Sequence, residues 1–133
     1  MQLYTGTKQV KAKPMNRADY NILRGWQLPA DEDGTDEGYL VEYVDGGKAN
    51  VEGFAGYISW SPKGVFEMAY NPCGTYKQRL QIEYYELQEK VVKLQAFVNT
   101  DSYDKLEELQ RLYLLGQLAS MKAYLNYLHL RLL

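Results

Sequence analysis

A short polar turn between two aromatic residues is the part of this chain best suited to binding chemistry. Phe97 and Tyr103 flank residues 99–102, Asn-Thr-Asp-Ser. Two rings beside hydroxyl and amide groups, with the exposed N–H groups of a helix start, suit a base joined to a phosphate. The same residues also fit a hydrophobic staple with Asn99 and Asp101 as caps, and the sequence alone favours that structural interpretation.

Cationic side chains follow the turn on a segment that is otherwise apolar. Arg111, Lys122 and His129 are separated by 11 and 7 residues, which places them within about 20° of one stripe of a helix. The stripe is either a solvent-exposed face or, in an oligomer, a positive pocket where copies meet. Arg131, on another side of the helix, is a second candidate for phosphate contacts.

The residues that could perform catalysis do not form a recognisable set. The chain has one His and one Cys, too few to make a Cys-based triad a good interpretation. Carboxylate pairs such as Glu83/Glu86 and Glu107/Glu108 fall on predicted exposed helix faces, without the contrasting environments that acid–base catalysis needs. No Gly-rich phosphate loop is present. We therefore expect binding without turnover, not an enzyme, and no cofactor.

An acidic segment covers residues 31–37. Its five carboxylates are Asp31, Glu32, Asp33, Asp36 and Glu37. They lack the alternating ligand spacing and central Gly of an EF-hand loop. We expect a solvated loop and no metal site.

The first half of the chain predicts a small β-rich module. Alternation predicts strands over residues 3–13, 39–44 and 56–60. Between the first two, Asn16 can cap a short helix over residues 17–24 that ends at Gly25. Ser61 as a cap and Pro62 at the first helical position predict a second helix after the last strand.

The second half predicts a helical hairpin. Steps of 3 and 4 residues give each helix one apolar seam, made of Leu80, Tyr84, Leu87, Val91, Leu94 and Val98 in the first and of Leu118, Met121, Leu125, Leu128 and Leu132 in the second. Asp101 or Ser102 can cap the second helix, which we expect to run from about Tyr103 to the C-terminus. A short connection implies antiparallel packing.

The expected fold class is therefore α+β, with a small antiparallel β module before a long antiparallel two-helix hairpin that oligomerises. We place the boundary in the turn-forming residues 71–74, so that residues 1–72 form the β-rich module and 73–133 the oligomerisation and ligand-binding module.

Oligomerisation is expected because residues 112–133 carry more apolar surface than a hairpin alone can bury. Apolar positions fall on most sides of this helix, whereas a surface helix normally has one stripe. A membrane span is the alternative, since about 20 residues suffice. Lys122 near the middle, at a cost of roughly 2.5–3.5 kcal/mol on insertion scales, decides against it.

Composition narrows the partners and the compartment. A net charge of −2 argues against binding to long nucleic acids, which requires a basic surface. The single cysteine, Cys73, fits a reducing compartment. The N-terminal residues have no apolar core of the signal-peptide kind, so we expect no export signal.

The hairpin resembles a known family. Residues 76–80 (Tyr-Lys-Gln-Arg-Leu), the Thr-Asp-Ser-Tyr sequence at 100–103, and the spacing of Gln117, Met121, Tyr124 and Arg131 resemble a helical-hairpin family of phage and prophage proteins. That family looks like the one containing the second anti-CBASS protein, a small hexameric sponge that sequesters cyclic oligonucleotide alarm signals.

The first module is similar to an N-terminal module common in phage proteins, over residues 24–26 (Arg-Gly-Trp) and 56–63 (Gly-Tyr-Ile-Ser-Trp-Ser-Pro-Lys). There it precedes various C-terminal units. A small β unit followed by two long helices is also expected of the first Thoeris anti-defence protein, whose family binds cyclic ADP-ribose isomers as a hexamer.

These resemblances imply a sponge that holds a cyclic nucleotide defence signal in the cytoplasm of an infected bacterium, as a hexamer or other closed homo-oligomer. They assign the ligand to the interhelical turn and to the end of the last helix. With the residues chosen from chemistry, the candidate ligand set is Phe97, Asn99, Thr100, Tyr103, Arg111, Lys122 and Arg131. The alternative function is a structural or adaptor protein whose hairpin pairs with a partner helix.

Overall fold

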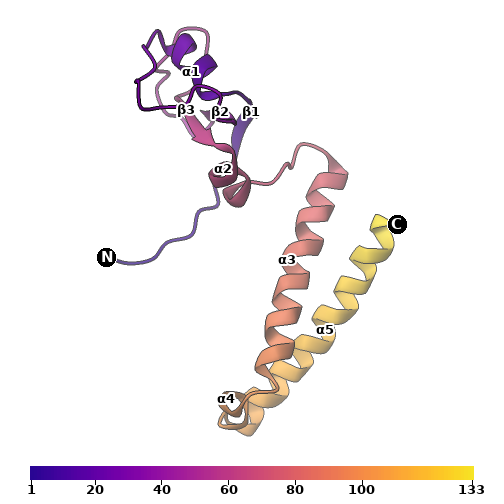
Figure 1. The fold of residues 1–133 in the computed structure, drawn as a ribbon. Coiled ribbons are helices and arrows are strands. Elements are labelled where there is room, and N and C mark those ends of the chain that lie inside the picture. Colours follow the sequence, from indigo (N-terminus) through magenta and orange to yellow (C-terminus); the bar gives the residue numbers. More distant parts are fainter. The chain divides into compact units, whose positions relative to one another are not determined.

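A computed structural model describes residues 1–133, which divide into unit 1 (Met1–Tyr70) and unit 2 (Asn71–Leu133). Unit 1 contains, in chain order, β1 (Val10–Pro14), α1 (Arg17–Arg24), β2 (Gly38–Tyr43), β3 (Ile58–Pro62) and α2 (Lys63–Ala69). Unit 2 contains α3 (Tyr76–Phe97), α4 (Asp101–Asp104) and α5 (Glu108–Leu132) (Figure 1). The predicted α+β class is confirmed.

The sheet of unit 1 is antiparallel with the strand order β1-β2-β3. The predicted first strand, residues 3–13, is too long, because β1 begins only at Val10. Val10 pairs with Tyr43, the last residue of β2. Residues 3–9 therefore have no strand left to pair with.

Helix α1 begins and ends where the sequence predicts. The Asn16 side chain accepts a hydrogen bond of 2.8 Å from the backbone N–H of Asp19. The helix stops at Gly25, whose φ of 69° lies in the left-handed region that Gly enters without strain.

Helix α2 begins one residue later than predicted, and Ser61 does not cap it. Ser61 and Pro62 belong to β3, where they pair with Tyr39 and Gly38 of β2. Strand pairing holds them in extended backbone, so the first helical residue is Lys63.

The core of unit 1 lies between α1 and the sheet. Tyr20, Leu40 and Ile58 are buried in it, and partly buried apolar side chains pack around them, namely Met15, Leu23, Val51, Phe54 and Trp60. Trp60 Nε1 also donates a hydrogen bond of 2.8 Å to the Met15 carbonyl, which ties β3 to the link between β1 and α1.

In unit 2, α3 and α5 pack along the two predicted seams (Figure 1). Leu80 and Val91 of α3 and Leu118 and Leu128 of α5 are buried, and the remaining seam residues are half-buried. The predicted hairpin and both seams are confirmed.

The connection between the long helices differs from the prediction. Thr100, not Asp101 or Ser102, is the N-cap, because its Oγ1 accepts a hydrogen bond from the Tyr103 N–H. It caps only the four-residue α4, which ends at Lys105. The long second helix begins at Glu108 and not near Tyr103.

Helix α5 leaves a large apolar surface uncovered on the side away from its seam. We call this surface the α5 outer face. Its large side chains are 51% to 67% exposed and comprise Leu109, Leu112, Tyr113, Tyr127 and Leu130. Small exposed residues lie between them, namely Gly116, Ala119, Ser120 and Ala123. The apolar surplus is confirmed, whereas the oligomer that it predicts stays a prediction.

No helix combines the length and the apolar character that a bilayer crossing requires.

Candidate ligand-binding site

The interhelical turn of unit 2 brings five of the seven predicted ligand residues into one region. Phe97 ends α3, residues 99 and 100 form the turn, Tyr103 lies on α4, and Arg111 lies in the first turn of α5. The Phe97 and Tyr103 rings meet edge to face, with their centres 6.1 Å apart. The aromatic contact that both interpretations of the turn require is therefore present.

Tyr103 and Arg111 are linked through the backbone. Tyr103 is buried, and its hydroxyl donates a hydrogen bond of 3.1 Å to the Arg111 carbonyl. The Arg111 guanidinium in turn donates to the Asp104 carbonyl at 3.4 Å. Tyr103 thus acts chiefly as an anchor of the turn, while half-buried Phe97 keeps ring surface that a ligand can contact.

Asn99 and Thr100 differ in which side-chain polar atoms remain available to a ligand. Thr100 Oγ1 donates to the Phe97 carbonyl at 2.6 Å and accepts from the Tyr103 N–H at 3.3 Å, so this hydroxyl has no donor left for a ligand. Asn99 Nδ2 donates to the Gln95 carbonyl at 3.0 Å, and its Oδ1 has no partner within the chain. Asn99 is therefore the better of the two for reading a polar ligand edge.

Lys122 and Arg131 lie away from this cluster. Lys122 reaches across the seam to Gln95 Oε1. Arg131 contacts the Tyr76 hydroxyl, with its guanidinium carbon 5.7 Å from the centre of that ring. Along α5, Arg131 is about 30 Å from Arg111. One copy of the chain therefore does not bring all seven predicted residues together.

The stripe of Arg111, Lys122 and His129 borders the seam with α3. Besides the Lys122 contact, the His129 ring lies 6.1 Å from the ring of Tyr84 on α3. These three side chains therefore lie beside the hairpin contact, and not on the α5 outer face.

The predicted cations keep their charge available. None of the chain's five ion pairs includes Arg111, Lys122 or Arg131. A cation without a carboxylate partner can bind a phosphate without first losing an ion pair.

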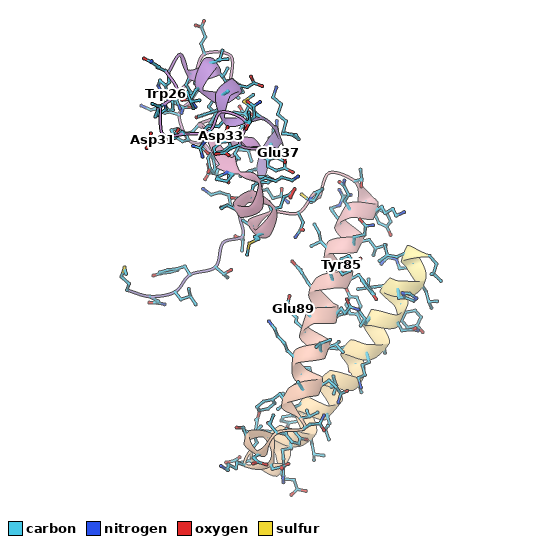
Figure 2. All side chains as sticks on the ribbon, in the orientation of Figure 1. Trp26, Asp31, Asp33, Glu37, Tyr85 and Glu89 are labelled. Atoms are coloured by element: carbon cyan, nitrogen blue, oxygen red, sulfur yellow. The ribbon has the colours of Figure 1, made fainter.

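A groove of about 340 Å³ follows the start of α3, and sequence reasoning missed it. Its walls include Pro72, Gln78, Ile82, Tyr85 and Glu86, and Figure 2 marks Tyr85 and, further along α3, Glu89, which also lines it. The hydrogen bond from Lys93 lowers the pKa of Glu89. Glu86 and Glu89 line the groove and no Lys or Arg does, which disfavours phosphate. Its only sequence signal was the exposed aromatic next to Tyr84.

The acidic loop of unit 1 is exposed, as predicted, and most of its carboxylates also have polar partners. Arg17 pairs with Glu32 and Asp36 at 3.4 and 3.3 Å, and Lys63 pairs with Glu37 at 3.2 Å. Asp33 accepts from the Thr35 hydroxyl, and this hydrogen bond lowers the pKa of Asp33. No three His, Cys, Asp or Glu side chains gather as a group that could hold a metal ion.

Comparison with known proteins bears on unit 2. Residues 74–133 match the family model described as Sequestin. The Sequestin match spans α3, α4 and α5 and contains all seven predicted ligand residues. It does not extend to unit 1. No curated protein matches the chain, and no solved structure matches it.

Proposed function

We propose that this protein captures a cyclic nucleotide defence signal, a cyclic ADP-ribose isomer or a cyclic oligonucleotide, and holds it without cleaving it. Capture lowers the free signal by mass action in the cytoplasm of an infected bacterium, so that the host effector is not activated. A binder of this kind needs slow release and a pocket that loses little entropy on binding.

The observation that carries the proposal is the Sequestin match over residues 74–133. The family name suggests a sequestering protein, and this fits an anti-defence role. The match coincides with the hairpin that holds every side chain selected earlier for binding a base and a phosphate.

The geometry of the turn supports a role for Phe97 and Asn99 in contacting the base. The Phe97 ring is half-buried and braced edge-on by the anchored Tyr103, so its orientation is set before a ligand arrives. Stacking on an aromatic ring contributes about 1–3 kcal/mol per base. The unpaired Asn99 Oδ1 can accept a hydrogen bond from the base or the ribose.

A second copy of the chain can cover the α5 outer face, which one copy leaves exposed. The α5 outer face has small residues at its centre and large apolar residues at both ends, which allows close approach of another helix. The exposed fractions of its side chains give the α5 outer face an accessible area on the order of 700 Å² per copy. Stable interfaces bury ~800 Å² per partner, which is close to this area. We therefore infer that copies pair through this face.

Antiparallel pairing of two α5 helices gives the best match of side-chain sizes. With the axis between Ala119 and Ser120, Gly116 lies opposite Ala123, and Leu112 opposite Tyr127. Arg131 of a second copy then lies level with residue 108, within one helical turn along the axis from Arg111. This pairing brings Arg131 of a second copy to the end of the hairpin that holds the turn, where it adds a cation for a ligand phosphate.

The test is native mass spectrometry of the full chain after incubation with cyclic ADP-ribose isomers and cyclic di- and trinucleotides. We expect a closed oligomer that retains a stoichiometric ligand, and chromatography should recover that ligand chemically unchanged. Recovery of a cleaved product would replace the proposal with an enzyme. An oligomer that retains nothing from the panel would favour the adaptor function instead.

Phe97→Ala locates the site, and Tyr85→Ala is its matched control, since Tyr85 is a ring on the same helix that is 63% exposed. Loss of one stacking contact should weaken binding by about 5- to 150-fold in Phe97→Ala, while Tyr85→Ala binds normally. Normal binding by Phe97→Ala, with loss in Tyr85→Ala, would move the site to the groove on α3.

A further inference from the structure

Unit 1 contains a cavity that the sequestration proposal does not use. Its volume is about 740 Å³, within the range of small-ligand sites. Residues from α1, from the segment after it and from β3 line the cavity, and they include Arg17, Asn21, Trp26, Gln27, Glu32 and Trp60. Trp26 is labelled in Figure 2. Both tryptophans of the chain are in this lining.

Asn21 gives the cavity a buried polar group with a free acceptor. Its side chain is on the inner face of α1, and only 9% of the residue is exposed. Its Nδ2 donates to the Arg17 carbonyl at 2.8 Å, whereas its Oδ1 has no partner within the chain. No side-chain nitrogen or oxygen of the chain is both fully buried and unpaired, so this oxygen is open to solvent and can accept a hydrogen bond from a ligand that enters the cavity.

The two indole rings are held in place by arginines. The guanidinium carbon of Arg24 lies 4.2 Å from the centre of the Trp26 ring, and that of Arg17 lies 4.5 Å from the centre of the Trp60 ring. Arg24 does not line the cavity, yet Trp26 does and is 52% exposed. The ring surface that Arg24 leaves uncovered is thus available for stacking, and the ring is already oriented.

The charges in the cavity lining favour a neutral part of a ligand over a phosphate. The only cation in the lining, Arg17, is paired with Glu32 and Asp36, so the cavity has little positive charge to offer a phosphate. A flat, neutral ring with N–H donors on its edge meets both the indole surface and Asn21 Oδ1. We propose that unit 1 binds a nucleobase in this cavity, as a free nucleoside or as an exposed base of a larger molecule.

A proline-rich peptide is the other ligand that aromatic grooves commonly bind. Its proline residues have no N–H, so a proline packed over the indoles would leave Asn21 Oδ1 unpaired. The nucleobase accounts for both observations. This inference does not depend on the sequestration proposal, because it concerns other residues in another unit.

Tryptophan fluorescence of the full chain gives a direct readout, since both tryptophans line the cavity. We titrate with adenosine, guanosine, cytidine and uridine, and in parallel with a proline-rich peptide. A saturable change with at least one nucleoside is expected. No change with any nucleoside up to about 10 mM, or saturation with the peptide alone, would overturn the inference.

Asn21→Leu tests the acceptor while keeping the side-chain volume close to that of Asn. We expect it to weaken nucleoside binding about tenfold. Tyr57→Ala is the control, because it removes a ring that is 47% exposed and does not line the cavity. Unchanged affinity in Asn21→Leu, for a variant with the wild-type circular dichroism spectrum, would contradict the role of Asn21 and with it the proposed site.

A second variant covers the case in which Asn21→Leu does not fold. Gln27→Ala changes an exposed residue of the lining and should weaken binding about two- to fivefold. Ligand-observed NMR on this variant reports binding without relying on fluorescence. Phe97→Ala should leave the tryptophan signal unchanged, which separates this site from the one at the hairpin turn.

Discussion

Gly116 gives the sharpest test of whether α5 packs against a second copy. It lies inside a long helix, and a Cβ added there would meet nothing within 4 Å. Within one copy, Gly at this position therefore has no packing role. Replacing a mid-helix Gly by Leu should stabilise an isolated helix by roughly 0.5–1 kcal/mol.

If another helix packs closely against Gly116, the same substitution destabilises the protein instead. A Leu side chain would separate the two helices at the point of closest approach and remove most of the contact across the α5 outer face. We expect Gly116→Leu to dissociate the oligomer and to lower the free energy of unfolding at a given protein concentration.

The assay combines light scattering after size exclusion with urea unfolding followed by circular dichroism. Gly64→Leu is the matched control, because Gly64 lies in α2 and a Cβ there also meets nothing within 4 Å. Its oligomeric mass should stay unchanged. A Gly116→Leu protein that keeps the wild-type mass and gains stability like the control would refute the reasoning about the α5 outer face.

Two further predictions concern the hairpin seam and a surface ion pair. Leu128 is 2% exposed, so Leu128→Ala should cost about 2–5 kcal/mol in urea unfolding, whereas Leu133→Ala, at an 87% exposed position, should cost little. In unit 1, the hydrogen bond from Lys8 lowers the pKa of Asp45 below 3.8. The stabilisation from this pair is therefore present above about pH 4 and lost as the pH falls through the folded-state pKa. Lys8→Met should raise the pKa of Asp45 in an NMR titration, and an unchanged pKa would contradict this cause.

Local signals predicted the elements whose boundaries depend on neighbouring residues. Helix α1 needs only the cap at Asn16 and the left-handed Gly25. Both seams of unit 2 follow from the helical period. In each case the contacts that set the element join residues close in sequence or repeat at the helical period. The sequence pattern therefore predicted the bounds of α1 and both seams.

Boundaries set by distant partners could not be predicted in this way. Val10 begins β1 because β2 ends at Tyr43, which lies 33 residues away in the sequence. Ser61 has the composition of a helix cap, yet pairing with Tyr39 keeps it in a strand. The early end of α4 likewise escaped prediction, because residues 104–107 contain no Gly or Pro that would mark a break between two helices.

The candidate site was predicted in part for the same reason. The cluster around the turn follows from chain proximity, as Phe97 and Tyr103 are six residues apart. Arg131 was added to the ligand set through family resemblance, although the predicted hairpin already puts it at the end away from the turn. The structure adds its contact with Tyr76. The cavity of unit 1 escaped notice because it joins Trp26, which follows α1, to Trp60 of β3, 34 residues away in the sequence.

The small core of unit 2 connects assembly with capture. Its buried apolar side chains are only Leu80, Val91, Tyr103, Leu118 and Leu128, and a unit of this size gains limited stability from its own core. Burial of the α5 outer face would supply the missing apolar contact. If the pocket also needs Arg131 from a second copy, a ligand binds only the assembled form and stabilises it. Capture should then rise more steeply than linearly with protein concentration at low protein levels. A strictly linear dependence would mean that a single copy holds the complete site.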